Sequence, residues 1–341
     1  MEELTRRTVL AGTGTLVAAF AASAGNAASP AAKPDLKGKS ILITGTSSGF
    51  GRVGALLYAR LGAQVFATMR NLPRPEADEL RKIAKDEKLD ITVLPLDVRS
   101  EAQVNATIAQ AEKLAGGALD VLVNNAGVVF GGPVEVHDME AAQFAFDTNV
   151  FGPLRTMRAA LPAMRARKSG VIVNISSQQG RFVMAGGGLY APTKFALEAM
   201  SEQLAYEVAP HGIEVLIIEP GGYPTSVGIN RARYQNELAA RIPERHASGY
   251  AEQVARLKAP PPDPARVAAA MAASPMGRSD PIDIPNAIAE VLAMTPGSRP
   301  LRRAVHPVSR PQEPINEVSR QVQLKLAEGS PNGVWVKAVL D

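Results

Sequence analysis

The chain has 341 residues, 46% hydrophobic and 21% charged, which is typical of a globular protein and argues against both disorder and a membrane-embedded fold. Its formal net charge of +4 is small and not concentrated in any block, so nucleic-acid binding has little electrostatic support. Cysteine is absent, which excludes disulfides and thiol chemistry, and the four histidines are too scattered for us to predict a metal site: His137, His211, His246 and His306.

The N-terminal residues read as an export signal. Arg6 and Arg7 precede an uncharged, mainly apolar run over 8–22, which is shorter than the about 20 residues that span a bilayer. Small residues follow, and the stretch TRRTVLA resembles a twin-arginine signal. We predict a signal at 1–27 that directs the protein to the periplasm, then a linker at 28–36. The alternative is an unused N-terminal tail on a cytoplasmic protein.

From residue 39 onward, short apolar runs alternate with amphipathic helical stretches. The apolar runs predict six buried strands, at 40–44, 63–68, 91–96, 120–125, 170–176 and 213–219. Helices are predicted from the glycine turn through residue 61, then over 76–88, 101–114, 141–167 with a break at 152–153, and 191–208. Continuous apolar strands that alternate with helices indicate a parallel sheet covered on both faces. The predicted fold is therefore α/β, a doubly wound, Rossmann-like parallel sheet in three layers, with a single domain at 37–305.

The last part of the chain is rich in proline and shows no core pattern of its own. We predict one helix over 285–294, which extends the same domain, and a poorly ordered tail at 306–341.

A glycine-rich stretch, TGTSSGFG, follows the first predicted strand and opens the first helix. Gly45, Gly49 and Gly51 permit a tight turn and let a pyrophosphate approach the backbone, while the helix start supplies free N–H groups and a positive dipole end. The alternative is a purely structural turn. The predicted coenzyme loop comprises Gly45, Thr46, Ser47, Ser48, Gly49, Phe50, Gly51 and Arg52.

The end of the second strand indicates which coenzyme fits. An NAD site usually places a carboxylate there, whereas an NADP site favours a nearby arginine. The sequence VFATMRN has no carboxylate but has Arg70, and Arg52 could add a second contact to the 2′-phosphate. Asp97 could accept a hydrogen bond from the adenine amino group, or it could cap a helix. We therefore predict NADP(H) over NAD(H), with surface arginines that bind no ligand as the alternative.

Tyr190 and Lys194 lie four residues apart in LYAPTK and should share one helix face. A tyrosine has a pKa of about 10, which a lysine ammonium nearby is expected to lower. Ser177, at the end of NISS, lies thirteen residues before the tyrosine, a spacing that favours it over Ser176.

Four signatures now stand in order: TGTSSGFG, NNAG at 124–127, NISS with YAPTK, and EPGGYPT at 219–225. Together they resemble the short-chain dehydrogenase/reductase family, in the subgroup with TGxxxGxG and YxxxK. The likeness is close over 37–226 and looser beyond. It implies a catalytic tetrad of Asn149, Ser177, Tyr190 and Lys194.

The resemblance also implies roles for these residues. Ser177 would orient the substrate oxygen and Tyr190 would exchange a proton with it. Lys194 would also hold the nicotinamide ribose, and Asn149 would hold a water that connects the lysine to solvent. The coenzyme contacts implied beyond the glycine loop are Arg70, Asp97, Val98, Asn125, Ala126, Gly127, Tyr190, Lys194, Pro220, Gly221 and Thr225. Pro192 and Thr193 replace the frequent Ala-Ser, which the first turn of a helix tolerates.

The implied function is an NADP(H)-dependent oxidoreductase that interconverts an alcohol with a ketone or aldehyde. A substrate region around 178–260 contributes an apolar set, which favours an uncharged, fairly apolar substrate: Phe182, Val183, Met184, Leu189 and Tyr223. Arg181 could instead bind an acidic group, although a solvated side chain is the simpler interpretation. Alternatives are a non-catalytic NADP(H) sensor and an epimerase or dehydratase. The family resemblance also implies a homodimer or homotetramer built through the helices that carry Asn149 and Tyr190.

Overall fold

The computed structural model describes residues 34–225, 234–260 and 279–341, with residues 263, 266, 269 and 273 between the last two ranges. The signal predicted at 1–27 and most of the predicted linker lie outside the described residues. Within the described ranges, no helix combines the length and the hydropathy that a membrane span requires.

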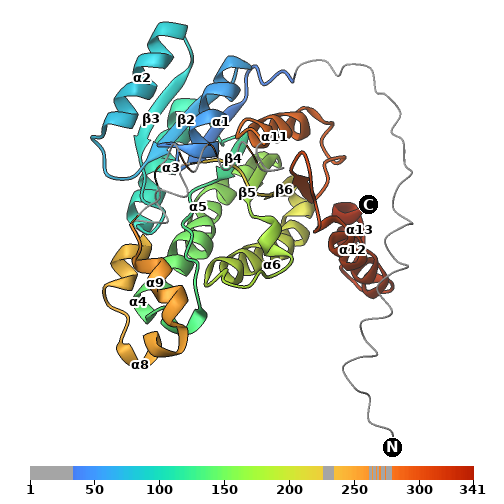
Figure 1. Cartoon of the computed structure of the whole chain (residues 1–341). Coiled ribbons are helices and arrows are strands. Elements are labelled where there is room, and N and C mark those ends of the chain that lie inside the picture. Colours follow the sequence, from blue (N-terminus) through green and yellow to red (C-terminus); the bar gives the residue numbers. More distant parts are fainter. Residues whose placement is uncertain are drawn as a thin grey trace, which may run out of the picture. The chain divides into compact units, whose positions relative to one another are not determined.

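A seven-stranded sheet forms the centre of the fold (Figure 1). Its order is β3-β2-β1-β4-β5-β6-β7, and every neighbouring pair is parallel. The strands are β1 (Ser40–Thr44), β2 (Gln64–Met69), β3 (Ile91–Pro95), β4 (Val121–Asn124), β5 (Gly170–Ile175), β6 (Ile213–Pro220) and β7 (Arg302–Val305). Ile41 pairs with Val65 on one side and Val121 on the other, so the strand order reverses at β1. In such sheets the ligand crevice opens at this reversal, beyond the carboxyl ends of the strands.

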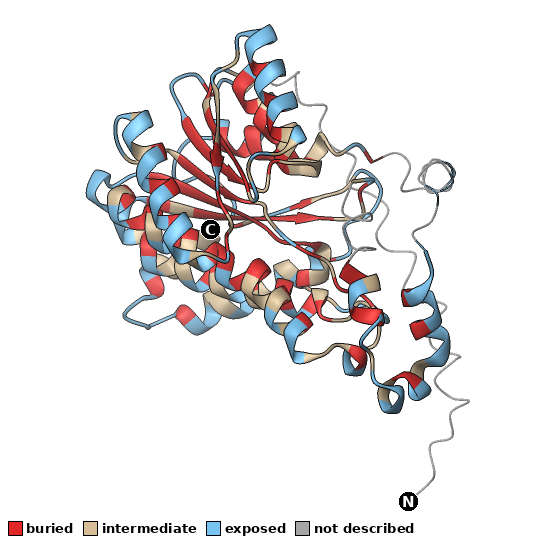
Figure 2. Cartoon of the chain, turned by 90° about the vertical axis from the view of Figure 1, so that its left-hand side faces the viewer, coloured by how far each residue is buried: buried red, intermediate tan, exposed pale blue. Residues whose placement is uncertain are grey.

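Helices cover both faces of the sheet, because alternate residues of each strand point to opposite sides. Ile41 and Ile43 pack with α1 (Gly49–Arg60), α2 (Pro75–Glu87) and α11 (Asp283–Ala293). Leu42 packs on the other face with α3 (Glu101–Ala115), α5 (Gly152–Arg167) and α6 (Tyr190–Val208). Figure 2 shows buried residues concentrated along the strands and the inner faces of these helices. The predicted doubly wound, three-layer architecture is confirmed.

The long helix predicted at 141–167 is continuous but irregular. It consists of α4 (Met139–Phe146), a π-helical turn at Asp147–Phe151, and α5. Pro153 has no N–H to donate, and the wider turn lets the chain pass it without breaking. The π-helical turn carries Asn149, so the irregularity falls on a predicted site residue.

The prediction of a poorly ordered tail at 306–341 is wrong over most of that range. β7, α12 (Glu313–Ala327) and α13 (Gly333–Leu340) belong to one compact unit that spans Pro34–Asp341, so no boundary falls at residue 305 either. The seventh strand was not predicted. Two further helices, α8 (Glu244–Ala247) and α9 (Ala251–Lys258), lie in the predicted substrate region.

The tail escaped prediction because α12 docks through polar side chains. Asn316 Nδ2 donates to Glu219 Oε2 at 2.7 Å, and Gln312 Nε2 donates to the Glu219 carbonyl at 3.2 Å. The apolar residues of the same helix face outward: Val318, Val322 and Leu326 are 61%, 51% and 76% exposed. A search for an apolar face turned towards a core therefore finds nothing here.

Candidate active site

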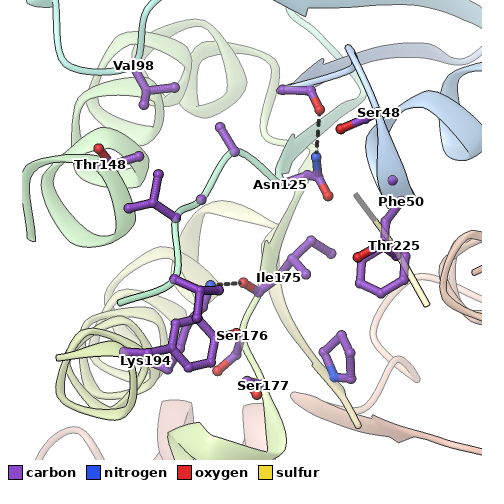
Figure 3. Close-up of a pocket in the computed structure, with 18 of the residues that line it drawn as sticks. Ser48, Phe50, Val98, Asn125, Thr148, Ile175, Ser176, Ser177, Lys194 and Thr225 are labelled. Carbon is purple, nitrogen blue, oxygen red and sulfur yellow. Dashed lines mark hydrogen bonds between the residues drawn. The ribbon is translucent and has the colours of Figure 1, made fainter. Parts of the chain in front are cut away.

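A cavity of about 460 Å³ opens beyond the carboxyl ends of β1, β2, β4, β5 and β6 (Figure 3). This volume is typical of a small-molecule site. Most of the predicted site residues line it: Gly45, Ser47, Ser48, Gly49, Phe50, Arg70, Asp97, Val98, Asn125, Ala126, Gly127, Ser177, Tyr190, Lys194, Pro220, Gly221 and Thr225. The predicted residues that do not line it are Thr46, Gly51, Arg52 and Asn149.

The glycine loop forms an open cradle at the start of α1. Gly45 and Gly49 adopt positive φ angles of 74° and 57°, which other residues rarely accept. A Cβ on Gly51 would lie 2.4 Å from the Gly45 carbonyl oxygen, so glycine is required there for close packing rather than for ligand contact. Asn125 Nδ2 fixes the loop by donating to the carbonyls of Thr44 and Gly45, at 2.9 and 3.1 Å. The cradle therefore fits a pyrophosphate at the helix N-terminus.

The two predicted phosphate-binding arginines lie in different places. Arg70 lines the cavity at the end of β2. Arg52 points away from it, since its Nη2 pairs with Glu79 Oε2 at 3.0 Å and its Nη1 donates to the Glu76 carbonyl at 3.2 Å. Arg52 is thus paired with residues of α2, and the second phosphate contact expected of it stays a prediction.

Asn149 is buried and joins two segments. Its Oδ1 accepts from the Val128 N–H at 2.8 Å, and its Nδ2 donates to the Val128 carbonyl at 2.9 Å. The same amide nitrogen donates to Thr193 Oγ1 at 3.0 Å, which in turn donates to the Tyr190 carbonyl at 2.7 Å. The side chain therefore locks the cavity wall after β4 to the first turn of α6, where Pro192 is accommodated.

Lys194 is buried and Tyr190 is half-buried in that first turn. Lys194 Nζ donates to the Ile175 carbonyl at 2.7 Å (Figure 3) and lies 5.8 Å from the centre of the tyrosine ring. Burial lowers the pKa of Lys194 to about 8, while Glu198 acts in the opposite direction. Burial also raises the pKa of Tyr190, against a hydrogen bond with Ser177 that lowers it. The expected lowering is therefore wrong in direction, because desolvation of the phenolate exceeds the favourable contacts.

Ser177 is the serine in contact with Tyr190. The hydrogen bond between their side chains is one of the two influences on the tyrosine pKa. Ser177 Oγ also accepts from the Gln179 N–H at 3.1 Å, which fixes the turn after β5. Ser176 also lines the cavity, but its hydroxyl lies close to Glu198, because a Cβ on Gly180 would touch both of their side chains. The geometry agrees with the choice that the thirteen-residue spacing favoured.

A buried charge cluster behind the site was not predicted. Arg302 on β7 binds three glutamates: its Nε lies 2.9 Å from Glu198 Oε2 and 3.6 Å from Glu219 Oε1, and its Nη2 lies 2.6 Å from Glu202 Oε2. Burial, reinforced by the charge of Glu198, raises the pKa of Glu219 to about 7. Arg181 is half-buried, and its charge contributes to lowering the pKa of Glu198 in this cluster.

The sequence could have indicated two members of this cluster but not its arginine. Glu198 lies four residues after Lys194 and Glu219 immediately precedes the PGG turn, so both could have been placed near the site. Their partner Arg302 lies on an unpredicted strand, which hid the cluster.

The predicted apolar substrate set is only partly at the cavity. Tyr223 lines it and packs edge-on against Phe50, with ring centres 5.5 Å apart. Leu189 is buried beside the site, whereas Val183 and Met184 are exposed. Phe182 does not line the cavity either.

A parallel sheet with a glycine cradle and a neighbouring tyrosine–lysine pair is typical of Rossmann-type oxidoreductases. The sequence profile described as short chain dehydrogenase matches residues 39–236. The chain belongs to this family.

Curated relatives include a 3-ketodihydrosphingosine reductase from Bacteroides thetaiotaomicron, 37% identical over 191 residues, which are 56% of this chain and 66% of that protein. Retinol dehydrogenase 8 from Homo sapiens is 38% identical over 209 residues, which are 60% of this chain and 63% of that protein. The match thus spans about two thirds of each relative's length.

Solved structures show the same fold. A short-chain dehydrogenase from Streptomyces avermitilis superimposes with a TM-score of 0.62 at 30% identity, over 86% of this chain and 98% of that one. A gluconate 5-dehydrogenase from Burkholderia cenocepacia, in complex with NADP and tartrate, superimposes with a TM-score of 0.54 at 30% identity, over 61% of this chain and 81% of that one.

Proposed function

We propose that the protein is an NADP(H)-dependent oxidoreductase of the TGxxxGxG/YxxxK subgroup, which interconverts an alcohol with a ketone or aldehyde. One observation carries this proposal: Ser177, Tyr190 and Lys194 line the same cavity as the glycine cradle, with Arg70 at the end of β2. The NADP bound to the related gluconate 5-dehydrogenase supports the choice of coenzyme class. The names of the curated relatives, a keto reductase and a retinol dehydrogenase, support a carbonyl or alcohol substrate.

The residues perform distinct steps. A bound nicotinamide coenzyme supplies or accepts the hydride. The Ser177 hydroxyl donates a hydrogen bond to the substrate oxygen and holds it beside Tyr190, which exchanges the proton. Lys194 places a positive charge beside this oxygen while its pKa of about 8 keeps it largely protonated at neutral pH. Because burial keeps Tyr190 protonated, it is a ready donor, which favours carbonyl reduction near pH 7.

The proposed substrate is uncharged and fairly apolar. Tyr223 and Phe50 present aromatic surface to the cavity. Arg181 does not line the cavity, and its charge acts on the buried glutamates Glu198 and Glu219.

The test is to mix the purified protein with NADPH and a panel of ketones and aldehydes while following the absorbance of the reduced nicotinamide. Carbonyl-dependent oxidation of NADPH is the expected result. NADPH binding without turnover on any substrate would favour the alternative of a coenzyme sensor. Conversion of a substrate with no net oxidation of coenzyme would favour an epimerase or dehydratase.

Export of the folded protein by the twin-arginine route is a further part of this proposal. Arg6 and Arg7 precede an apolar run in the sequence, and this route moves folded proteins, as a coenzyme-binding enzyme would require. Replacement of both arginines by lysine should leave the protein in the cytoplasm. An unchanged location would contradict export, in favour of the cytoplasmic alternative.

A further inference from the structure

The end of β5 is attached to α6 residue by residue. Lys194 Nζ donates to the Ile175 carbonyl at 2.7 Å, and the side chain of Tyr190 shares a hydrogen bond with that of Ser177. Because Tyr190 and Lys194 are four residues apart, they lie on one face of the helix. Figure 3 shows Ser176, the residue between these two attachments, next to the bond of Lys194. The next turn of α6 on the same face therefore lies towards Ser176.

Glu198 occupies that turn. It follows Lys194 by four residues, and only 2% of it is exposed. A Cβ on Gly180 would lie 2.7 Å from Ser176 Oγ and 3.2 Å from Glu198 Oε1, so the two oxygens flank the same point. In the part of the chain that the structure describes, both oxygens are buried and neither has a well-formed hydrogen bond elsewhere. A bond from the serine hydroxyl to the carboxylate would satisfy both.

Arg302 favours the charged form of this carboxylate. Its Nε lies 2.9 Å from Glu198 Oε2 but 3.6 Å from Glu219 Oε1, so Glu198 is the better paired of these two acids. Burial raises the pKa of both, to about 7 for Glu219, while the charge of Arg302 opposes the rise. Glu198 is therefore the acid of this pair that ionises first as the pH rises. The other charged side chains around it are Lys194 and Glu202 on α6 and Arg181 after β5.

We propose that Glu198 is a positioning residue for the reaction, an inference that rests on the proposed function. Held by Arg302, its carboxylate accepts a hydrogen bond from Ser176 and places a negative charge one turn behind Lys194. The hydrogen bond fixes the strand end that presents Ser177, and the charge favours the ammonium form of Lys194. Glu198 does not line the cavity, so it acts through these residues and not on the substrate itself.

The test follows the ionisation of Lys194 by NMR in the full chain with carbon-13-labelled lysine, and Lys194→Met assigns the resonance. Burial lowers the pKa of Lys194 to about 8, and the charge of Glu198 opposes this lowering. Glu198→Gln keeps the shape of the side chain and removes the charge, whereas Glu198→Asp keeps the charge and withdraws it from Ser176. Glu202→Gln is the matched control, because Glu202 also pairs with Arg302, at 2.6 Å, but lies one turn farther from Lys194.

The kinetic arm measures kcat, and KM for NADPH, across the same pH range with the ketone that the wild type reduces fastest. Glu198→Gln should lower the titration midpoint of Lys194 by about one pH unit, and the high-pH limb of kcat should move with it. Its kcat at pH 7.5 should fall by about tenfold, with KM for NADPH within about threefold of wild type. Glu198→Asp should keep the midpoint but lower kcat by about threefold. The control should keep both.

An unchanged midpoint in Glu198→Gln, or an equal shift in Glu202→Gln, would overturn the inference, because the cluster would then act only as a structural ion pair. A wild-type kcat in Glu198→Asp would also overturn it, and this variant decides the matter if Glu198→Gln does not fold. If the wild type reduces no ketone, the proposed function fails, while the NMR midpoint still decides whether Glu198 sets the charge of Lys194.

Discussion

Asn149 shows how one polar side chain can join two parts of the candidate site without lining the cavity. It satisfies both backbone groups of Val128 and reaches Thr193 in the turn that carries Tyr190. Replacement by alanine would leave two buried backbone groups unpaired, at a cost of about 2–4 kcal/mol in the free energy of unfolding. Denaturant titration measures this loss, and the turnover rate should fall with it. Thr148→Val, which removes a bond to a helix carbonyl, is the control for stability alone, because Thr148 also lines the cavity.

A wild-type stability in Asn149→Ala would show that water or a neighbour satisfies Val128, and would contradict the locking role.

Glu219 predicts a pH effect on stability. Its pKa is raised to about 7 from an ordinary value near 4.5, so the folded state holds a proton that the unfolded state has lost between these pH values. The stabilisation from this proton is complete below pH 4.5 and is lost as the pH rises through 7. Glu219→Gln mimics the protonated form and should therefore gain roughly 1–3 kcal/mol relative to wild type between pH 4.5 and 7.5. Urea titrations across that range check it, and a constant difference would contradict it.

The positions of site residues were predictable where their spacing along the sequence determines which of them lie together. The thirteen-residue step from Ser177 to Tyr190 and the four-residue step to Lys194 placed all three correctly in one cavity. Arg52 does not line the cavity because it pairs with Glu79 on another helix, a contact that nearness in sequence to the glycine loop does not reveal. The direction of the Tyr190 pKa was missed for a similar reason, since it depends on burial that only the packed structure defines.

Among the elements, β7 is attached through charge to α6, the helix that carries the proposed catalytic residues Tyr190 and Lys194. Arg302 is the centre of this attachment, with Glu198 and Glu202 from α6. Arg302→Met would leave three buried carboxylates facing one another and should destabilise the fold by about 3–5 kcal/mol at neutral pH. The loss should shrink in acid, where the carboxylates are protonated. Arg303→Met is the control, because Arg303 is exposed and its nearest acid, Glu290, lies 3.5 Å away.

Thermal melting of the two variants at pH 5 and pH 7.5 measures both effects. Equal, small losses in the two variants would show that the cluster contributes little to holding β7.

Helices and strands that are held by apolar burial were predicted from the sequence, whereas those held by long-range polar pairings were not. The six strands and their helices were predicted because continuous apolar runs and amphipathic periods encode burial directly, as at 40–44 and 213–219. β7 has only four residues, two of them arginines, and α12 exposes its valines. Their stability comes from pairings over about 100 positions, such as Arg302 with Glu202, which no local pattern contains.

At the scale of the whole molecule, apolar side chains on α5, α6 and the π-helical turn indicate a partner. Phe151, Leu154 and Phe195 are 47%, 37% and 40% exposed. We propose that a second copy covers them, as in the homodimer or homotetramer that the family resemblance implies. Phe195→Glu should reduce the molar mass measured by light scattering, because a buried charge at an interface is costly. Leu114→Glu, at an exposed position on α3, should leave the mass unchanged.

A monomeric wild-type protein would contradict this assembly, and so would an unchanged mass for Phe195→Glu.

In the proposed function Tyr190, which lines the cavity, exchanges a proton with the oxygen of an alcohol or carbonyl substrate. Tyr190→Phe tests it most directly, with carbonyl-dependent NADPH oxidation and NADPH affinity measured on the same preparation. We expect the turnover of the Tyr190→Phe variant to fall by about 10³-fold or more. Its NADPH affinity should stay within about threefold of wild type, since only the hydroxyl is removed. Full turnover in the Tyr190→Phe variant would contradict it.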